Sequence, residues 1–194
     1  MSQNKGFNSM IAKNTKFILA ILFQIAVIFL VILSKYTILN TGVEVRLRIL
    51  PVDPRTPLRG DYMKLSYNIS NLNSRLADGH KIRNGDTVYV VLDKQGRYWE
   101  AKNISKTKPT GSSLFIKGTV IRGGVAYDTI YPDANKGLSN NLLISYGIED
   151  YFIPESSGRD LNIRNKEMSA AVVIDRATGE AVLKQVFLDN EPWP

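Results

Sequence analysis

The chain has 194 residues, no cysteine, one histidine and a formal net charge of +7, and it is long enough for one ordinary domain and an additional anchor. The missing cysteines exclude a disulfide framework, a thiolate nucleophile and a cysteine-ligated metal site, and the single histidine excludes a double-histidine site. Because the first 35 residues carry four lysines and no acid, only +3 of the charge belongs to the remainder, and this mild excess gives no basis for nucleic-acid binding.

The first predicted element is a membrane-spanning helix over residues 17–34. This stretch, FILAILFQIAVIFLVILS, is apolar apart from Gln24 and Ser34. As a helix it would be about 27 Å long, close to the hydrocarbon thickness of a bilayer. A cleaved signal peptide is the alternative, but its apolar core would be only about 7–15 residues long and a small-residue cleavage pattern would follow it. We therefore expect an uncleaved signal anchor that contacts the lipid bilayer.

The lysines beside this span predict its orientation. Three lysines precede the span, and Lys35 alone follows it closely. The positive-inside rule then places the N-terminus in the cytoplasm and the rest of the chain outside it. The expected divisions are a cytoplasmic N-terminus (1–16), the span (17–34), a short tether (35–42) and an extracytoplasmic β-rich domain (43–194).

Beyond the tether, apolar residues recur with a period of two, which is typical of half-buried strands. Residues 43–49 alternate in this way, and residues 62–69 place Met63, Leu65, Tyr67 and Ile69 on one face. Later runs flank the turn sequences DKQG, RGG and RATG, which predicts hairpins. The fold class is therefore mainly β, with one N-terminal transmembrane helix followed by a compact antiparallel barrel or sandwich-like domain. Residues 154–168 lack the period of two and are compatible with a short helix.

Two Gly-Asp pairs, Gly60–Asp61 and Gly85–Asp86, each precede an alternating run. Glycine accepts a positive φ in a turn, and aspartate accepts hydrogen bonds from nearby backbone N–H groups. We expect both pairs to be turns that lead into strands. The residues to which we assign a structural turn role are Pro51, Pro54, Pro57, Gly60, Gly85, Asp86, Gly147 and Gly158.

The stretch PVDPRTPLRGDY, residues 51–62, combines three prolines with four charges. The prolines favour an extended, stiff backbone. Asp53, Arg55, Arg59 and Asp61 are compatible with two arrangements. They can close the loop as a structural ion-pair network, or they can bind an anion or a peptide terminus, because the arginine fork fits carboxylate and phosphate. The structural network is the favoured interpretation.

Residues 60–67, GDYMKLSY, fit the pattern G-D-Y-x-x-L-x-Y, and PVDPRTPLRGDY upstream and YGIEDYFIPESSGRDL downstream extend the agreement. The chain resembles the GDYXXLXY family of bacterial membrane-anchored proteins over nearly all of its length past the anchor. The resemblance implies an inner-membrane protein with an extracytoplasmic domain and no established activity. It also implies a polytopic membrane protein as a partner.

Aromatic and acidic residues near this pattern are further candidates. Four tyrosines are compatible with an aromatic pocket, although strand packing with each hydroxyl hydrogen-bonded is favoured. Glu149 and Glu155 are candidates for paired carboxylates in acid–base chemistry, but the sequence does not place them in one cleft. We expect no metal or cofactor, and we expect His80 to be a solvated loop residue. The candidate binding residues are Asp53, Arg55, Arg59, Asp61, Tyr62, Tyr67, Tyr146, Glu149, Tyr151 and Glu155.

The sequence favours a membrane-anchored interaction or accessory protein of the bacterial envelope over an enzyme. The alternative is an envelope hydrolase or ligand sensor with a signal-peptidase-like fold. Residues 51–62 are similar in layout to the nucleophile segment of signal peptidases, but Asp53 falls near the position of the serine and cannot act as that nucleophile. Fold analogy of this kind does not by itself carry a function.

Overall fold

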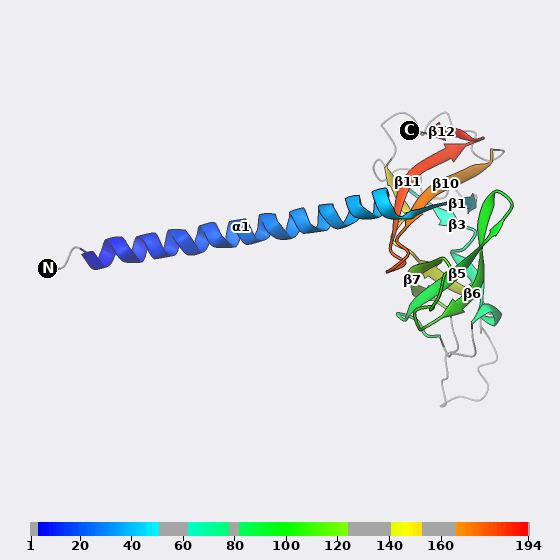
Figure 1. The fold of residues 1–194 in the computed structure, drawn as a ribbon, viewed down its shortest axis with the longest axis horizontal. Coiled ribbons are helices and arrows are strands. Elements are labelled where there is room, and N and C mark those ends of the chain that lie inside the picture. Colours follow the sequence, from blue (N-terminus) through cyan, green and yellow to red (C-terminus); the bar gives the residue numbers. More distant parts are fainter. Residues whose placement is uncertain (1–3, 51–61, 78–81, 124–140, 153–165, 194) are drawn as a thin grey trace, which may run out of the picture.

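One long helix projects from a β domain (Figure 1). The computed structural model describes residues 4–50, 62–77, 82–123, 141–152 and 166–193. The helix, α1, spans Asn4–Thr41, and within its part Thr15–Thr41 the most apolar window of 18 residues has a mean hydropathy of 3.0 and no buried side chain. By length and composition α1 is a candidate membrane span, which agrees with the helix expected over residues 17–34.

Residues 35–41 of the segment expected as a tether, 35–42, are the last part of this helix. Helix α1 ends at Thr41, and Gly42 alone separates it from the first strand, β1 (Val43–Leu50). The Gly42 N–H donates to the Ile38 carbonyl at 2.9 Å, and Ile38 is buried against the domain. The helix therefore passes directly into the β domain.

In the described residues, the β domain contains two five-stranded antiparallel sheets and one two-stranded sheet. The strand orders are β12-β11-β10-β1-β3, β4-β8-β7-β5-β6 and β2-β9. The remaining elements are β2 (Tyr62–Lys64), β3 (Ser66–Tyr67), β4 (Asn71–Asn73), η1 (Ser74–Leu76), β5 (Thr87–Gln95), β6 (Tyr98–Ser105), β7 (Phe115–Arg122), β8 (Asn141–Ser145), β9 (Asp150–Phe152), β10 (Met168–Ile174), β11 (Ala181–Leu188) and β12 (Glu191–Trp193).

The mainly β fold class is confirmed, and the period-two pattern identifies core faces correctly. Val45, Leu47 and Ile49 of β1 are buried in a single apolar core to which all three sheets contribute. The hairpins β5–β6 and β10–β11 form where DKQG and RATG predict them. Gly96, in the first turn, has a φ of 60°, a conformation in which a Cβ is disfavoured. The second strand expected for the RGG hairpin lies outside the described residues. Most of residues 154–168, the stretch compatible with a short helix, lies outside them as well.

The run over residues 62–69 is two strands instead of one. Strand β2 pairs with β9, with Tyr62 opposite Phe152, whereas β3 pairs with β1, with Tyr67 opposite Ile49. At Leu65, between β2 and β3, the N–H donates to the Glu149 carbonyl at 2.6 Å. This short segment thus links the two-stranded sheet to the sheet that contains β1.

The sequence patterns also missed the last strand, β12. It follows β11 through Asp189 and Asn190, which have φ values of 49° and 75°. Positive φ at both central residues is the requirement of a two-residue type I′ hairpin turn, and aspartate and asparagine tolerate it better than most residues. The Asp-Asn pair was therefore an available hairpin signal.

Candidate functional site

Two buried tyrosines join residues 67–69 to residues 146–148, two segments that are far apart in the sequence. The Tyr67 hydroxyl donates to the Ile148 carbonyl at 2.6 Å, and the Tyr146 hydroxyl donates to the Ile69 carbonyl at 2.6 Å. Tyr67 is fully buried, and Tyr146 is buried as well. Each hydroxyl thus satisfies a buried carbonyl that would otherwise lack a partner, which is costly in a protein interior. We call Tyr67, Ile69, Tyr146 and Ile148 the tyrosine latch.

A carboxylate holds the turn that begins at Tyr146. Glu149 accepts hydrogen bonds from the Tyr146 N–H at 2.5 Å and from the Gly147 N–H at 2.9 Å, one at each oxygen. Gly147 has a φ of 76°, so a glycine is favoured at this position. The Glu149 side chain is therefore engaged in the turn and is half-buried. This arrangement uses the carboxylate as a structural acceptor.

Burial and the charge of Glu149 act on both hydroxyls of the tyrosine latch. Burial raises the pKa of the Tyr67 and Tyr146 hydroxyls above the ordinary value, and the negative charge of Glu149 raises both further. Both phenols therefore stay protonated and remain hydrogen-bond donors throughout the neutral range.

Tyr151 lies apart from the latch. Its hydroxyl donates to the Trp193 carbonyl at 2.9 Å, and the two rings are 5.7 Å apart between centroids. The Gln185 side-chain amide donates to the same carbonyl at 2.7 Å. Burial raises the pKa of the Tyr151 hydroxyl. Tyr151 therefore anchors β12, the C-terminal strand, to β9.

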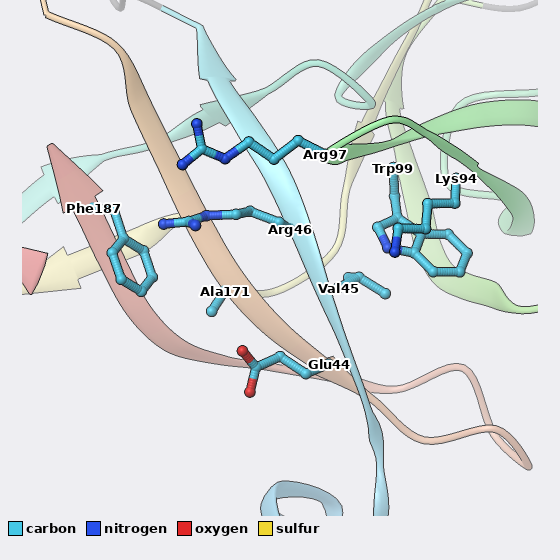
Figure 2. Close-up of a pocket in the computed structure, with 8 residues that line it drawn as sticks. All are labelled: Glu44, Val45, Arg46, Lys94, Arg97, Trp99, Ala171 and Phe187. Atoms are coloured by element: carbon cyan, nitrogen blue, oxygen red, sulfur yellow. The ribbon is translucent and has the colours of Figure 1, made fainter. Parts of the chain in front are cut away.

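A separate cavity of about 220 Å³ lies between β1, the β5–β6 turn and β11 (Figure 2). Arg46 and Arg97 line it, and Figure 2 shows their guanidinium groups extending in the same direction. The Arg46 guanidinium lies 4.0 Å from the centre of the Phe187 ring, a cation–π contact. This cavity combines positive charge with aromatic surface. No three acidic or histidine side chains in the described part of the chain are arranged to hold a metal.

Comparison with known proteins identifies the family. The family model described as GDYXXLXY protein matches residues 24–186, most of the chain. The chain belongs to the GDYXXLXY family. No curated protein matches the sequence, and no solved structure matches it.

In this GDYXXLXY protein, the described part of the sequence motif forms structural contacts. Leu65 is buried in the core, and its backbone is hydrogen-bonded to Glu149. Tyr67 is the last residue of the motif and belongs to the tyrosine latch. Tyr62 pairs through its backbone with Phe152. The motif thus connects β2 and β3 to the segment 146–152, the first part of the stretch YGIEDYFIPESSGRDL that extends the family resemblance.

The structure brings together some of the predicted site residues of the GDYXXLXY protein. Tyr67 and Tyr146 belong to the tyrosine latch, and Glu149 accepts from the Tyr146 N–H. The Gly85–Asp86 pair forms a turn into β5: Gly85 has a φ of 85°, and the Asp86 side chain accepts from the Arg83 N–H at 2.7 Å. The predicted residues outside the described ranges are Pro51, Asp53, Pro54, Arg55, Pro57, Arg59, Gly60, Asp61, His80, Glu155 and Gly158.

The Asp86 carboxylate also makes a short ion pair. Its oxygen lies 2.7 Å from the Lys106 ammonium, and this bond, together with the Arg83 N–H bond, lowers the pKa of Asp86. The turn therefore ties β5 to the residues that follow β6.

Sequence reasoning missed Arg46 in this GDYXXLXY protein. The alternation in β1 assigns Arg46 to the polar face, together with Glu44 and Arg48. In the structure Arg46 is half-buried, because Arg97 and Trp99 of the β5–β6 hairpin line the same cavity. Alternation reports the face of a strand but contains no information about what covers that face, so no local signal identifies the cavity.

Proposed function

We propose that this protein is an accessory subunit that binds another integral membrane protein in the inner membrane of the bacterial envelope. Helix α1 would be an uncleaved signal anchor with residues 1–16 in the cytoplasm and residues 43–194 on the other side. The unequal distribution of lysines about the span supports this orientation. The proposal develops the expectation of a polytopic partner.

The observation that carries the proposal is the polar side chain of Gln24 within the apolar span. It is the one strongly polar side chain within the apolar stretch 17–33, and it is exposed on α1. Its amide makes no hydrogen bond to another described residue, and hydrocarbon offers none. Polar side chains within membrane spans are costly unless they hydrogen-bond across to another helix. A partner helix that presents a polar group to Gln24 removes this cost.

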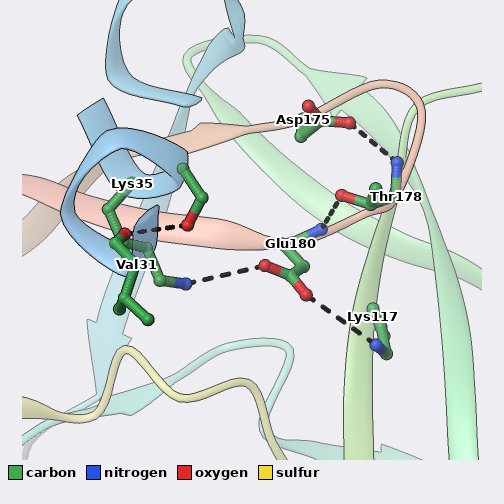
Figure 3. Close-up of polar contacts among 7 residues, drawn as sticks. Val31, Lys35, Lys117, Asp175, Thr178 and Glu180 are labelled. Atoms are coloured by element: carbon green, nitrogen blue, oxygen red, sulfur yellow. Dashed lines mark hydrogen bonds and ion pairs between the residues drawn. The ribbon is translucent and has the colours of Figure 1, made fainter. Parts of the chain in front are cut away.

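The junction between helix and domain supports the same role (Figure 3). The Glu180 carboxylate lies 3.7 Å from the Lys35 ammonium of α1 and 3.9 Å from the Lys117 ammonium of β7. The turn before Glu180 is fixed by Asp175, which accepts from the Thr178 N–H at 2.7 Å. Because these pairs are largely exposed, each contributes little stability alone. Together with buried Ile38 they orient the domain relative to α1, as a subunit that contacts a partner at the membrane surface requires.

Residues 51–67 and 146–158 contain the extracytoplasmic surfaces that we propose as additional contacts. Arg55 and Arg59 provide forks for carboxylates of a partner. This part of the proposal rests on the sequence alone.

The test is photocrosslinking of the full chain in its native membrane, followed by mass spectrometry. Wild type is compared with Gln24→Leu, with Gln24→Asn and with Ser34→Ala. Gln24→Asn keeps a side-chain amide, and Ser34→Ala is the matched control because the Ser34 hydroxyl already donates to the Val31 carbonyl within α1 at 2.8 Å. We expect an integral membrane protein to be captured by wild type, Gln24→Asn and Ser34→Ala, and to be lost in Gln24→Leu.

Two results would contradict this function. Equal capture by Gln24→Leu and wild type would show that the Gln24 amide is not needed to bind the partner. Capture of a second copy of this chain and of nothing else would replace an accessory subunit with a homo-oligomer.

A further inference from the structure

The guanidinium of Arg46 has two buried donors without partners. Its Nε and Nη2 atoms are buried, and neither has a hydrogen-bond partner among the described residues. Buried side-chain donors are normally hydrogen-bonded, and an unpaired buried charged group is especially costly. This exception therefore indicates that another group completes the environment of Arg46.

The two unpaired atoms define which group fits. Nε and Nη2 lie on the same edge of the planar guanidinium, so their N–H bonds form a fork. A carboxylate presents two oxygens that match this fork in a bidentate pair. Phe187 covers one face of the guanidinium at 4.0 Å, and the Nε–Nη2 edge is itself buried, so a ligand reaches this edge only when the side chains that cover it move aside.

The other residues of the cavity favour a negatively charged ligand. Arg97 and Lys94 add two cationic side chains, and Glu44 is the one acid among the residues that line it. The Glu44 carboxylate is paired with the Lys184 ammonium at 2.6 Å, so a cation outside the cavity already compensates its charge. The cavity thus carries an excess of positive charge beside Arg46.

The size and surface of the cavity restrict the occupant further. A volume of about 220 Å³ lies below the roughly 300–1,000 Å³ of sites that hold drug-sized ligands. Phe187 and Trp99 supply aromatic surface next to the charged groups. A small molecule with one carboxylate and a compact apolar body matches these properties.

We propose that the cavity between β1, the β5–β6 turn and β11 binds a small apolar carboxylate, with its oxygens on the Nε–Nη2 edge of Arg46. Arg97 supplies a second positive charge, and the apolar part of the ligand contacts Phe187 and Trp99. This site is independent of the partner contact proposed for Gln24. It gives the domain a ligand-binding role on the side of the membrane where the domain lies.

Calorimetric titration of the full chain in neutral detergent micelles tests the site. Benzoate is the probe, benzamide is its uncharged analogue, and inorganic phosphate is the competing anion. We expect saturable binding of benzoate and much weaker binding of benzamide, which lacks the charge, and of phosphate, which lacks an apolar body for Phe187 and Trp99. Arg46→Gln and Arg46→Lys should each weaken benzoate binding at least about tenfold, since neither side chain offers two parallel charged donors.

Arg48→Gln is the matched control. Arg48 lies two residues further along β1, its guanidinium is 4.8 Å from the Tyr98 ring, and it does not line the cavity. This variant removes the same charge and should bind benzoate within about twofold of wild type. Circular dichroism verifies folding, and Arg97→Gln, expected to weaken binding severalfold, provides a second test if Arg46→Gln does not fold.

The results that overturn the proposal are specific. If wild type does not bind benzoate, the cavity is not a site for a small apolar carboxylate. Equal weakening by Arg46→Gln and Arg48→Gln would attribute binding to net charge instead of the fork. Binding of benzamide as tightly as benzoate, or of phosphate in place of benzoate, would refute the carboxylate assignment.

Discussion

Tyr67 and Tyr146 are related by a reciprocal pattern: each donates its hydroxyl to the carbonyl two residues beyond the other, at Ile148 and Ile69, and both distances are 2.6 Å. The residues of each bond are about 80 positions apart in the chain, with separations of 81 and 77. Tyr67 is the last residue of the family motif, so its hydrogen bond gives a physical reason for a tyrosine at that position. The motif tyrosine closes the domain across two distant segments.

Removing a latch hydroxyl should destabilise the domain. In Tyr67→Phe or Tyr146→Phe, a buried carbonyl loses its partner, and this costs about 1–3 kcal/mol of the free energy of unfolding. Urea denaturation of the full chain in detergent micelles, followed by fluorescence of the two tryptophans, measures the loss. Tyr89→Phe is the control, because Tyr89 is half-buried and its hydroxyl makes no hydrogen bond among the described residues. A loss as large in Tyr89→Phe would show that the latch bonds are not the cause.

The latch also predicts a loss of stability at alkaline pH. Burial and then the charge of Glu149 raise the pKa of Tyr67, so the folded state keeps a proton that the unfolded state releases above its ordinary value of about 10. The unfolded state then binds fewer protons than the folded state, and the free energy of unfolding falls as the pH rises. The contribution is complete below pH 10 and declines above it by up to about 1.4 kcal/mol per pH unit.

Urea titrations between pH 8 and pH 11 measure this dependence. The advantage of wild type over Tyr67→Phe should be constant up to about pH 10 and should shrink above it. A difference that stays constant to pH 11 would mean that the Tyr67 hydroxyl does not resist ionisation in the folded state.

Glu149 should behave as a structural acceptor. In Glu149→Gln one oxygen is replaced by an NH₂ group, so only one of the two backbone N–H groups of Tyr146 and Gly147 keeps its acceptor. We expect a loss of about 1–2 kcal/mol in the free energy of unfolding, measured by urea denaturation. Asp150→Asn is the control, because the Asp150 carboxylate lies 3.9 Å from the exposed Lys64 ammonium and should contribute little. Stability equal to wild type in Glu149→Gln would free this carboxylate for the acid–base role considered from the sequence.

Local patterns predict the strands of this protein better than they predict its sheets. The alternation in β1 places Val45, Leu47 and Ile49 inward because side chains alternate between faces whatever the partner strand is. The pairing of β1 with β10, in which Val45 lies opposite Val172, depends on residues more than 100 positions away. No local pattern contains that information, and the division of residues 62–69 between two sheets was missed for the same reason.

The candidate site shows the same limit. The sequence singled out Tyr67, Tyr146 and Glu149 because they lie in or near the family motif, and the structure joins them. Their contacts with one another depend on distances in the folded chain, and the spacing of these residues in the sequence does not give those distances. Arg46 was assigned to a solvated face, because nothing in β1 predicts that the β5–β6 hairpin lies over it.

The junction of α1 with β1 gives the last prediction, since Gly42 leaves no room for a side chain. A Cβ at this position would lie 2.6 Å from both the Ile38 carbonyl oxygen and the Val173 Cγ1 atom, well inside van der Waals contact. Gly42→Ala should therefore force the helix away from the domain, and spin labels on α1 and β11 should report a broader distance distribution. Tyr36→Ala, at an exposed position of the same helix end, is the control and should leave the distribution unchanged. An unchanged distribution in Gly42→Ala would show that the helix and the domain are not rigidly joined at this glycine.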